Sequence, residues 1–215
     1  MKPYHLLSTS LAVFALLAFG GCASNRYNDK AANTSSSLNK AAQDVRQGNG
    51  QIDAVLIALS SLVDSPAADL KPQFNKFTAA LEKLESLADD VSKQAGAMQG
   101  QGANYFRSWD QELAKINNED IRSRSTERKN AVSARFERVR VTYAQTKSAF
   151  APFLSDLKDI RTALATDLTT GGLASIRTVA NQARDKAPPL REALSELELD
   201  FQNLGVSLSA KNPAR

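Results

Sequence analysis

The chain has 215 residues, a formal net charge of +4, and only one histidine and one cysteine. Such a mild positive surplus is not typical of a dedicated nucleic-acid-binding protein, so we expect no nucleic acid among its partners. The single histidine, His5, lies in a segment that we expect to be removed. The rest of the chain would then lack the residues for a Ser-His-Asp triad, a Cys-His pair or a zinc site of the His/Cys type.

Residues 1–21 have the pattern of a secretory signal peptide. Lys2 and the free N-terminus supply positive charge, an apolar run follows over residues 11–19, and two glycines precede Cys22. The apolar run is shorter than the roughly 20 residues that a membrane-spanning helix needs. We therefore expect this segment to be cleaved rather than to remain as a transmembrane anchor.

The stretch "FGGC" over residues 19–22 resembles the lipobox of bacterial lipoproteins, whose cysteine is acylated and becomes the new N-terminus. The resemblance implies that Cys22 carries palmitate-type acyl chains and anchors the protein to a lipid bilayer. Ala23 is uncharged, and by lipoprotein sorting rules the absence of Asp there implies the periplasmic face of the outer membrane. The alternative is a chance cysteine after an ordinary signal peptide.

Residues 22–37 are polar and show no period, which predicts a flexible tether. From residue 38 to 208 apolar residues recur at alternating steps of three and four, the spacing of helices packed side by side. Four such tracks follow one another. Their members are Leu38, Ala42, Val45, Gly48, Ile52, Val55, Leu59 and Leu62; Leu70, Phe74, Phe77, Leu81, Leu84, Ala88, Val91, Ala95, Met98, Gly102, Tyr105, Trp109, Leu113 and Ile116; Val132, Phe136, Val139, Tyr143, Thr146, Phe150, Phe153, Leu157, Ile160 and Leu164; and Leu173, Ile176, Ala180, Ala183, Ala187, Leu190, Leu194, Leu197, Phe201, Leu204 and Leu208.

These tracks predict an all-α fold, an elongated antiparallel four-helix coiled-coil bundle. Short connections favour antiparallel neighbours, and the second and third helices are long enough to project as a two-helix hairpin tip around residues 117–128. Asn118 is the expected cap of the third helix, and residues 209–215 are expected to form a disordered tail. Helix breakers at 48–50, at Pro152 and at 188–189 fall at one level and predict a shared bend.

The hairpin tip is the candidate contact surface. Seven basic residues lie between 122 and 140, against only two glutamates. The pattern favours a solvated, salt-bridged helix face; the functional alternative is a surface that attracts an envelope protein or an anionic envelope polymer. The residues predicted to contact this partner are Phe106, Trp109, Arg122, Arg124 and Arg128.

The glycine-rich stretch 96–102 and the acidic residues of the chain are two further features of the sequence. The glycine-rich stretch 96–102 is either a hinge below the tip or a place where the third helix approaches closely near Phe136. Acidic neighbours such as Asp89 and Asp90 are available for carboxylate chemistry, but on a narrow bundle such residues usually point into solvent. We therefore expect no catalysis, no cofactor and no metal.

From about residue 69 to 207 the chain resembles an uncharacterised family of bacterial secreted helical proteins, known only as a domain of unknown function. The resemblance rests on "SWDQEL" at 108–113, "RSRSTERKNAVSARFERV" at 122–139, "FAPFLSDLKDIRTALATDL" at 150–168 and "LASI" at 173–176. It implies an elongated helical lipoprotein or periplasmic protein and brings no known activity. We expect a structural spacer or protein-interaction module; the alternative is an accessory subunit of an envelope transport or secretion assembly that docks through the hairpin.

Overall fold

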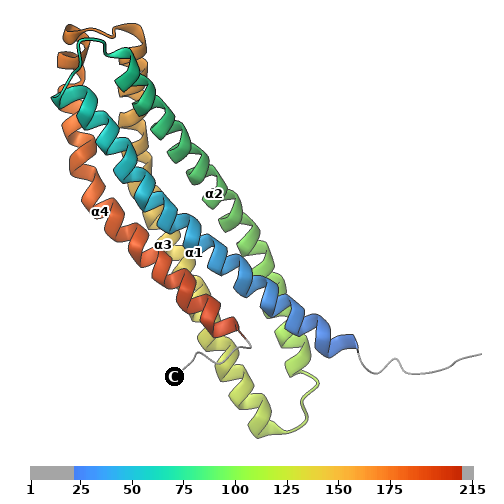
Figure 1. Ribbon diagram of the computed structural model, residues 1–215. Coiled ribbons are helices and arrows are strands. Elements are labelled where there is room, and N and C mark those ends of the chain that lie inside the picture. The colour runs from blue at the N-terminus through green and yellow to red at the C-terminus, as the bar shows by residue number, and fades with distance from the viewer. Residues whose placement is uncertain (1–21, 210–215) are drawn as a thin grey trace, which may run out of the picture.

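The computed structural model describes residues 22–209, so the predicted signal peptide over 1–21, and the tail predicted over 209–215 apart from its first residue, lie outside the described residues. The described chain contains no strand and forms an all-α bundle, as predicted (Figure 1). Its four helices are α1 (Cys22–Asp64), α2 (Lys71–Leu113), α3 (Glu119–Thr166) and α4 (Thr170–Leu208).

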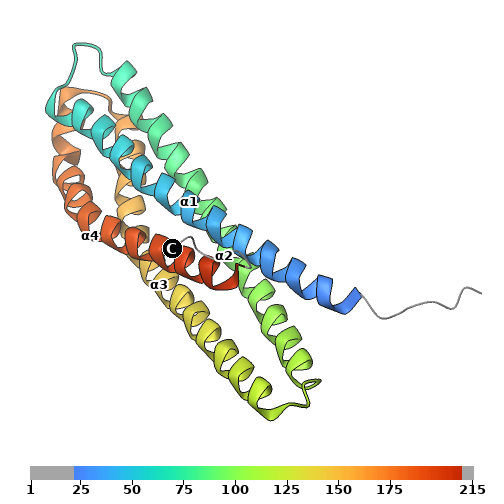
Figure 2. The ribbon, with the colours of Figure 1, turned by 60° about the horizontal axis from the view of Figure 1, so that its bottom comes forward.

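The helices pack in the order α2, α1, α4, α3 around the bundle. Contacts are extensive between α1 and α2, between α1 and α4, and between α3 and α4, whereas α2 and α3 contact each other much less. The start of α1 and the connection 114–118 lie at one end of the bundle, and the connections 65–70 and 167–169 lie at the other (Figures 1 and 2). The side of the bundle between α2 and α3 is therefore the least tightly closed.

The predicted tether over 22–37 is wrong, because α1 is helical from Cys22 onward. The side chains of Thr34 and Ser35 are buried, and the Ser35 hydroxyl donates a 3.0 Å hydrogen bond to the Gly205 carbonyl of α4. A Cβ added to Gly205 would lie 3.6 Å from the Leu38 side chain, so the two helices approach closely here. Small polar residues can thus join a helix interface without any apolar period.

The core follows the predicted tracks over most of their length. Every apolar position predicted on α4 is buried, and three phenylalanines, Phe77, Phe153 and Phe201, are among the largest fully buried side chains. Burying a side chain of this size contributes about 1.5–3 kcal/mol relative to leaving it exposed. The apolar seam is therefore the main source of stability of the bundle.

Polar caps end the helices at the connections. The side chain of Asn118 accepts a 3.0 Å hydrogen bond from the Ile121 amide, which confirms the predicted cap of α3. Thr169 caps α4 in the same way by accepting from the Gly172 amide at 3.2 Å. Each cap satisfies an amide that the first turn of a helix leaves without a backbone partner.

The prolines predicted to bend the bundle lie inside helices. Pro152 is within α3, and Pro188 and Pro189 are within α4. In Figure 2 α4 changes direction partway along its length. Because proline cannot donate to the carbonyl four residues earlier and crowds it, a bend at these positions has a direct local cause.

The glycine-rich stretch 96–102 lies inside the continuous helix α2. A Cβ added to Gly102 would lie 2.2 Å from the ring of Phe136 on α3, whereas one added to Gly96 or Gly100 would meet nothing within 4 Å. Of the two interpretations of this stretch, close approach therefore holds at Gly102.

Gly102→Ala should lower the free energy of unfolding by about 1–3 kcal/mol, because the new methyl group overpacks the Phe136 ring. Gly96→Ala and Gly100→Ala should instead raise it by about 0.5–1 kcal/mol, since both gain helix propensity in open space. Urea denaturation followed by circular dichroism measures all three. The same sign at all three positions would contradict the close approach, and adding Phe136→Leu to Gly102→Ala should restore part of the loss.

Candidate functional site

Of the two aromatic residues predicted to contact a partner, Phe106 packs across to α3 and Trp109 packs within α2. Phe106 and Trp109 are half-buried and pack against the core. The Phe106 ring meets Phe136 edge-on, with centroids 5.8 Å apart, and Trp109 meets Tyr105 in the same manner at 5.5 Å. Only part of each ring remains available for a partner.

Two of the predicted contact arginines, Arg122 and Arg124, are exposed near the start of α3. Arg122 lies 3.4 Å from the carboxylate of Glu119, which is itself highly exposed, so this ion pair contributes little. Arg124 makes no ion pair or side-chain hydrogen bond within the described part of the chain. Its charge is therefore free to attract an anion.

Arg128, the third predicted contact arginine, links α3 to the end of α4. Its Nη2 donates a 2.5 Å hydrogen bond to the Ser207 carbonyl, one of the last carbonyls of α4. Those carbonyls have no partner within the helix and carry the negative end of its dipole. Arg128 thus has a structural role that the sequence pattern did not indicate.

The basic surface between 122 and 140 is only partly neutralised. Lys129 pairs with Asp110 of α2, and Arg140 donates to Glu137, from Nε to Oε2 at 2.9 Å. The hydrogen bonds from Arg140 lower the pKa of the Glu137 carboxyl below its ordinary value. The basic residues that have no carboxylate partner in the described part of the chain are Arg124, Arg128, Arg135 and Arg138.

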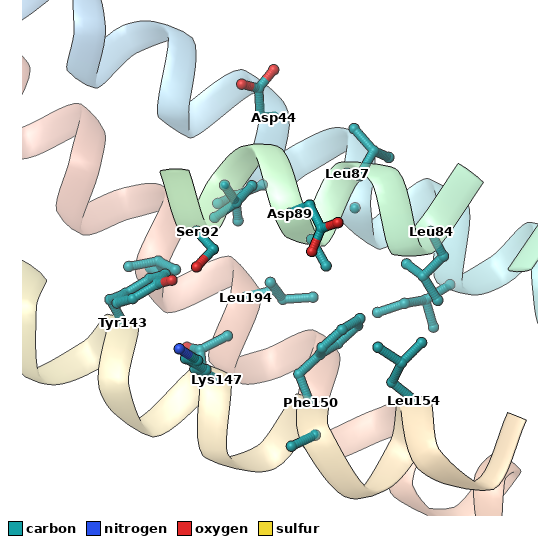
Figure 3. Close-up of a pocket in the computed structure, with 18 residues that line it drawn as sticks. Asp44, Leu84, Leu87, Asp89, Ser92, Tyr143, Lys147, Phe150, Leu154 and Leu194 are labelled. Carbon is teal, nitrogen blue, oxygen red and sulfur yellow. The ribbon is translucent and has the colours of Figure 1, made fainter. Parts of the chain in front are cut away.

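A second candidate site is a pocket of about 360 Å³ between α2 and α3. Residues of α1 and α4 form its floor, and apolar side chains make up most of its lining (Figure 3). Its volume lies within the range of about 300–1,000 Å³ that is typical of small-molecule sites. This pocket was not predicted from the sequence.

The pocket lies where the predicted seam fails to close. The predicted core positions that line it and remain only partly buried are Gly48, Ala88, Val91, Tyr143 and Phe150. A Cβ added to Gly48 would meet nothing within 4 Å, so that position leaves open space on the side of α1. Gly48 of α1 and Ala88 of α2 are small residues at predicted core positions, and this pattern could have indicated a pocket.

An empty, enclosed void of this size could not be tolerated. At about 24 cal/mol per Å³, a closed cavity of about 360 Å³ would cost about 9 kcal/mol. That is comparable with the whole stability of a typical domain, about 5–15 kcal/mol. The pocket is instead open to the surface, where the exposed residues Asp89, Ser92 and Lys147 form its rim.

The polar groups of the rim are unevenly placed. Ser92, Tyr143 and Lys147 gather toward one end of the pocket, Leu84 and Leu154 lie toward the other, and Asp89 lies between them on the α2 side (Figure 3). The sequence order agrees with this view, because later residues of α2 and earlier residues of α3 both lie nearer the connection 114–118. The pocket therefore has a polar and an apolar end.

A buried carboxylate borders the pocket on the side of α1. Asp44 is 8% exposed and accepts hydrogen bonds from Lys40 Nζ at 2.8 Å and from Gln94 Nε2 at 2.5 Å. The ion pair with Lys40 and the amide of Gln94 offset the cost of burying this charge. Asp44 is thus already satisfied within the protein and needs no ligand.

Neither site contains a metal-binding cluster within the described part of the chain. Among residues 22–209, no three His, Cys, Asp or Glu side chains gather closely enough to hold a metal ion. None of the helices in this range contains a stretch long and apolar enough to cross a membrane. The side chain of Cys22, the predicted lipidation site, lies outside the described side chains.

The fold and the two sites define a helical-bundle protein with a basic end and an apolar pocket. The chain belongs to a family described as a protein of unknown function (DUF2959), whose family model matches residues 28–197. This match confirms the family resemblance seen in the sequence. Comparisons with curated proteins and with solved structures find no significant match.

Arg128→Ala should loosen the last turn of α4, because the Ser207 carbonyl loses a charged donor worth about 1.5–3 kcal/mol when shielded and less at this exposed site. Hydrogen–deuterium exchange of the amides at 204–208 should become faster. The control is Arg124→Ala, which removes an exposed arginine of the same helix and should leave that exchange unchanged. Unchanged exchange in both variants would contradict the structural role of Arg128.

Proposed function

We propose that this protein is an outer-membrane lipoprotein, anchored on the periplasmic face through acylated Cys22, and that it acts as a non-catalytic helical spacer and interaction module. The "FGGC" stretch carries the anchor. The proposal is supported by one observation: the start of α1, which carries the anchor, and the α2–α3 connection lie at the same end of the bundle (Figure 1).

Helix lengths account for that arrangement. α1 and α2 each have 43 residues and are joined by the short connection 65–70. At 1.5 Å per residue each is about 63 Å long, so in an antiparallel pair Cys22 and Leu113 come to the same level. In this coiled-coil bundle the hairpin tip formed by α2 and α3 faces the membrane that holds Cys22, and the opposite end projects into the periplasm.

The charge of the tip fits a membrane-facing position. Arg124 is exposed and has no described partner, and Ile121 beside it is 57% exposed although it is apolar. A basic residue close to an anionic surface contributes about 1 kcal/mol of attraction. A lipid anchor together with a basic surface is the two-signal arrangement that holds peripheral proteins firmly.

Cys22→Ser should abolish incorporation of labelled palmitate and should release the protein from the outer-membrane fraction. The wild-type chain should incorporate the label. Equal labelling of both chains would remove the anchor, and with it the proposed localisation.

The orientation is tested by photo-crosslinking in living cells. A photo-reactive amino acid at Arg124 should capture lipid, whereas the same residue at Ala68, which is exposed in the connection at the opposite end, should not. Equal lipid capture at both positions would contradict a tip that faces the membrane. A single discrete protein captured at Arg124 would instead favour an accessory subunit that docks on a membrane assembly.

A further inference from the structure

We propose that the pocket between α2 and α3 binds one single-chain lipid, an unbranched alkyl chain that ends in an anionic oxygen group. A long-chain carboxylate and a lysophospholipid phosphate share this chemistry. The inference is independent of the acylation of Cys22, because it rests on the shape, lining and charge of the pocket alone.

The shape of the pocket selects an elongated ligand. From Leu84 to Ser92 along α2 the lining extends for eight residues, about 12 Å, and from Tyr143 to Leu154 along α3 it extends for eleven, about 16 Å. The pocket holds about 360 Å³, more than twice the volume of about 150 Å³ that accommodates benzene in an engineered cavity. A narrow apolar slot of this length fits an alkyl chain better than a compact ring system.

The lining selects an apolar tail. The side chains that face one another across the slot are mostly aliphatic or aromatic, and Leu194 and Leu197 of α4 close the floor beneath them. Phe150 and Leu154 lie on the α3 side toward the apolar end (Figure 3). Transfer of an alkyl chain from water into such a lining is favourable in proportion to the apolar area that it buries.

The polar end selects the headgroup. Lys147, Tyr143 and Ser92 supply an ammonium and two hydroxyl groups there, and none of the three side chains makes an ion pair or hydrogen bond within the described part of the chain. An anionic oxygen group would pair with the Lys147 ammonium and accept from the hydroxyls. Asp89 lies further along the rim, on the α2 side. Its carboxylate repels an anionic headgroup and so disfavours binding of that headgroup at this part of the entrance.

The protein's own anchor cannot be the occupant. Gly48 lies 26 residues after Cys22 on the same helix, a distance of about 39 Å. An acyl chain fills one leaflet of a hydrocarbon core of about 30 Å, so it extends for about 15 Å. The ligand must therefore be a separate molecule.

The binding test uses the protein carrying Cys22→Ser, which cannot be acylated at that position. Isothermal titration calorimetry with dodecanoate, with dodecyl phosphate and with dodecanol compares a carboxylate, a phosphate and an uncharged head on the same tail. We expect one site per chain and an affinity for one or both anions about tenfold above that for dodecanol. No binding of either anion would overturn the proposal.

Two glycines of α1 supply a matched pair of variants. Gly48 lines the pocket and Gly50 does not, and a Cβ added at either position would meet nothing within 4 Å. Gly48→Leu should fill the slot and lower the affinity at least about tenfold, whereas Gly50→Leu should leave it unchanged. Both variants gain helix propensity and should fold; Ala88→Leu provides a second obstruction from α2. Equal affinity in the two glycine variants would overturn the site.

Two charge variants test the headgroup with opposite expected signs. Lys147→Gln should weaken dodecanoate binding about tenfold and leave dodecanol unchanged, and Asp89→Asn should strengthen dodecanoate binding. No change of affinity in either variant would overturn the anionic head. The oligomeric state of Gly48→Leu is measured by analytical ultracentrifugation. A changed oligomeric state together with unchanged lipid affinity would show that a second copy of the chain covers the slot. That result would overturn the proposal of a lipid ligand.

Discussion

The whole architecture depends on burial of one apolar seam whose side chains are spaced three and four residues apart on each helix. This spacing gives each helix one apolar stripe, and four stripes can be buried together only if the helices close around a common axis. α4 packs extensively on both α1 and α3, and all of its predicted core positions are buried. α2 has such a neighbour only in α1, so the seam is complete on three sides and open on the fourth.

Much of the fold could be predicted from the sequence because it depends on this spacing. The four helices, most core positions and the cap at Asn118 all follow from local patterns. The helical start of α1 could not be predicted, because Thr34 and Ser35 are buried without being apolar. Their place in the interface depends on Gly205 of α4, which is 170 residues away from Ser35 in the chain and allows the two helices to approach.

The pocket is a second feature that could not be predicted from the sequence. Tyr143 and Phe150 have the spacing of core residues, and so does Gly48, but spacing does not tell whether the facing helix fills the space between them. Whether the space is filled depends on the summed volume of the side chains that lie at the same level of the bundle. That volume depends in turn on which residues of α1, α2 and α3 meet there. Gly102 illustrates the opposite outcome, because there the space left by a glycine is filled by the Phe136 ring.

The two proposals constrain each other through the geometry of the bundle. The polar end of the pocket points toward the connection 114–118 and hence toward the end where α1 begins (Figures 1 and 3). If that end lies on a membrane, Gly48 stands about 39 Å from the anchor residue, farther than an acyl chain of about 15 Å can reach from the bilayer. A lipid that occupies the pocket must then leave the bilayer completely. A single-chain amphiphile meets this requirement far more readily than a two-chain lipid, because each buried methylene adds about 0.8 kcal/mol to the free energy needed for extraction.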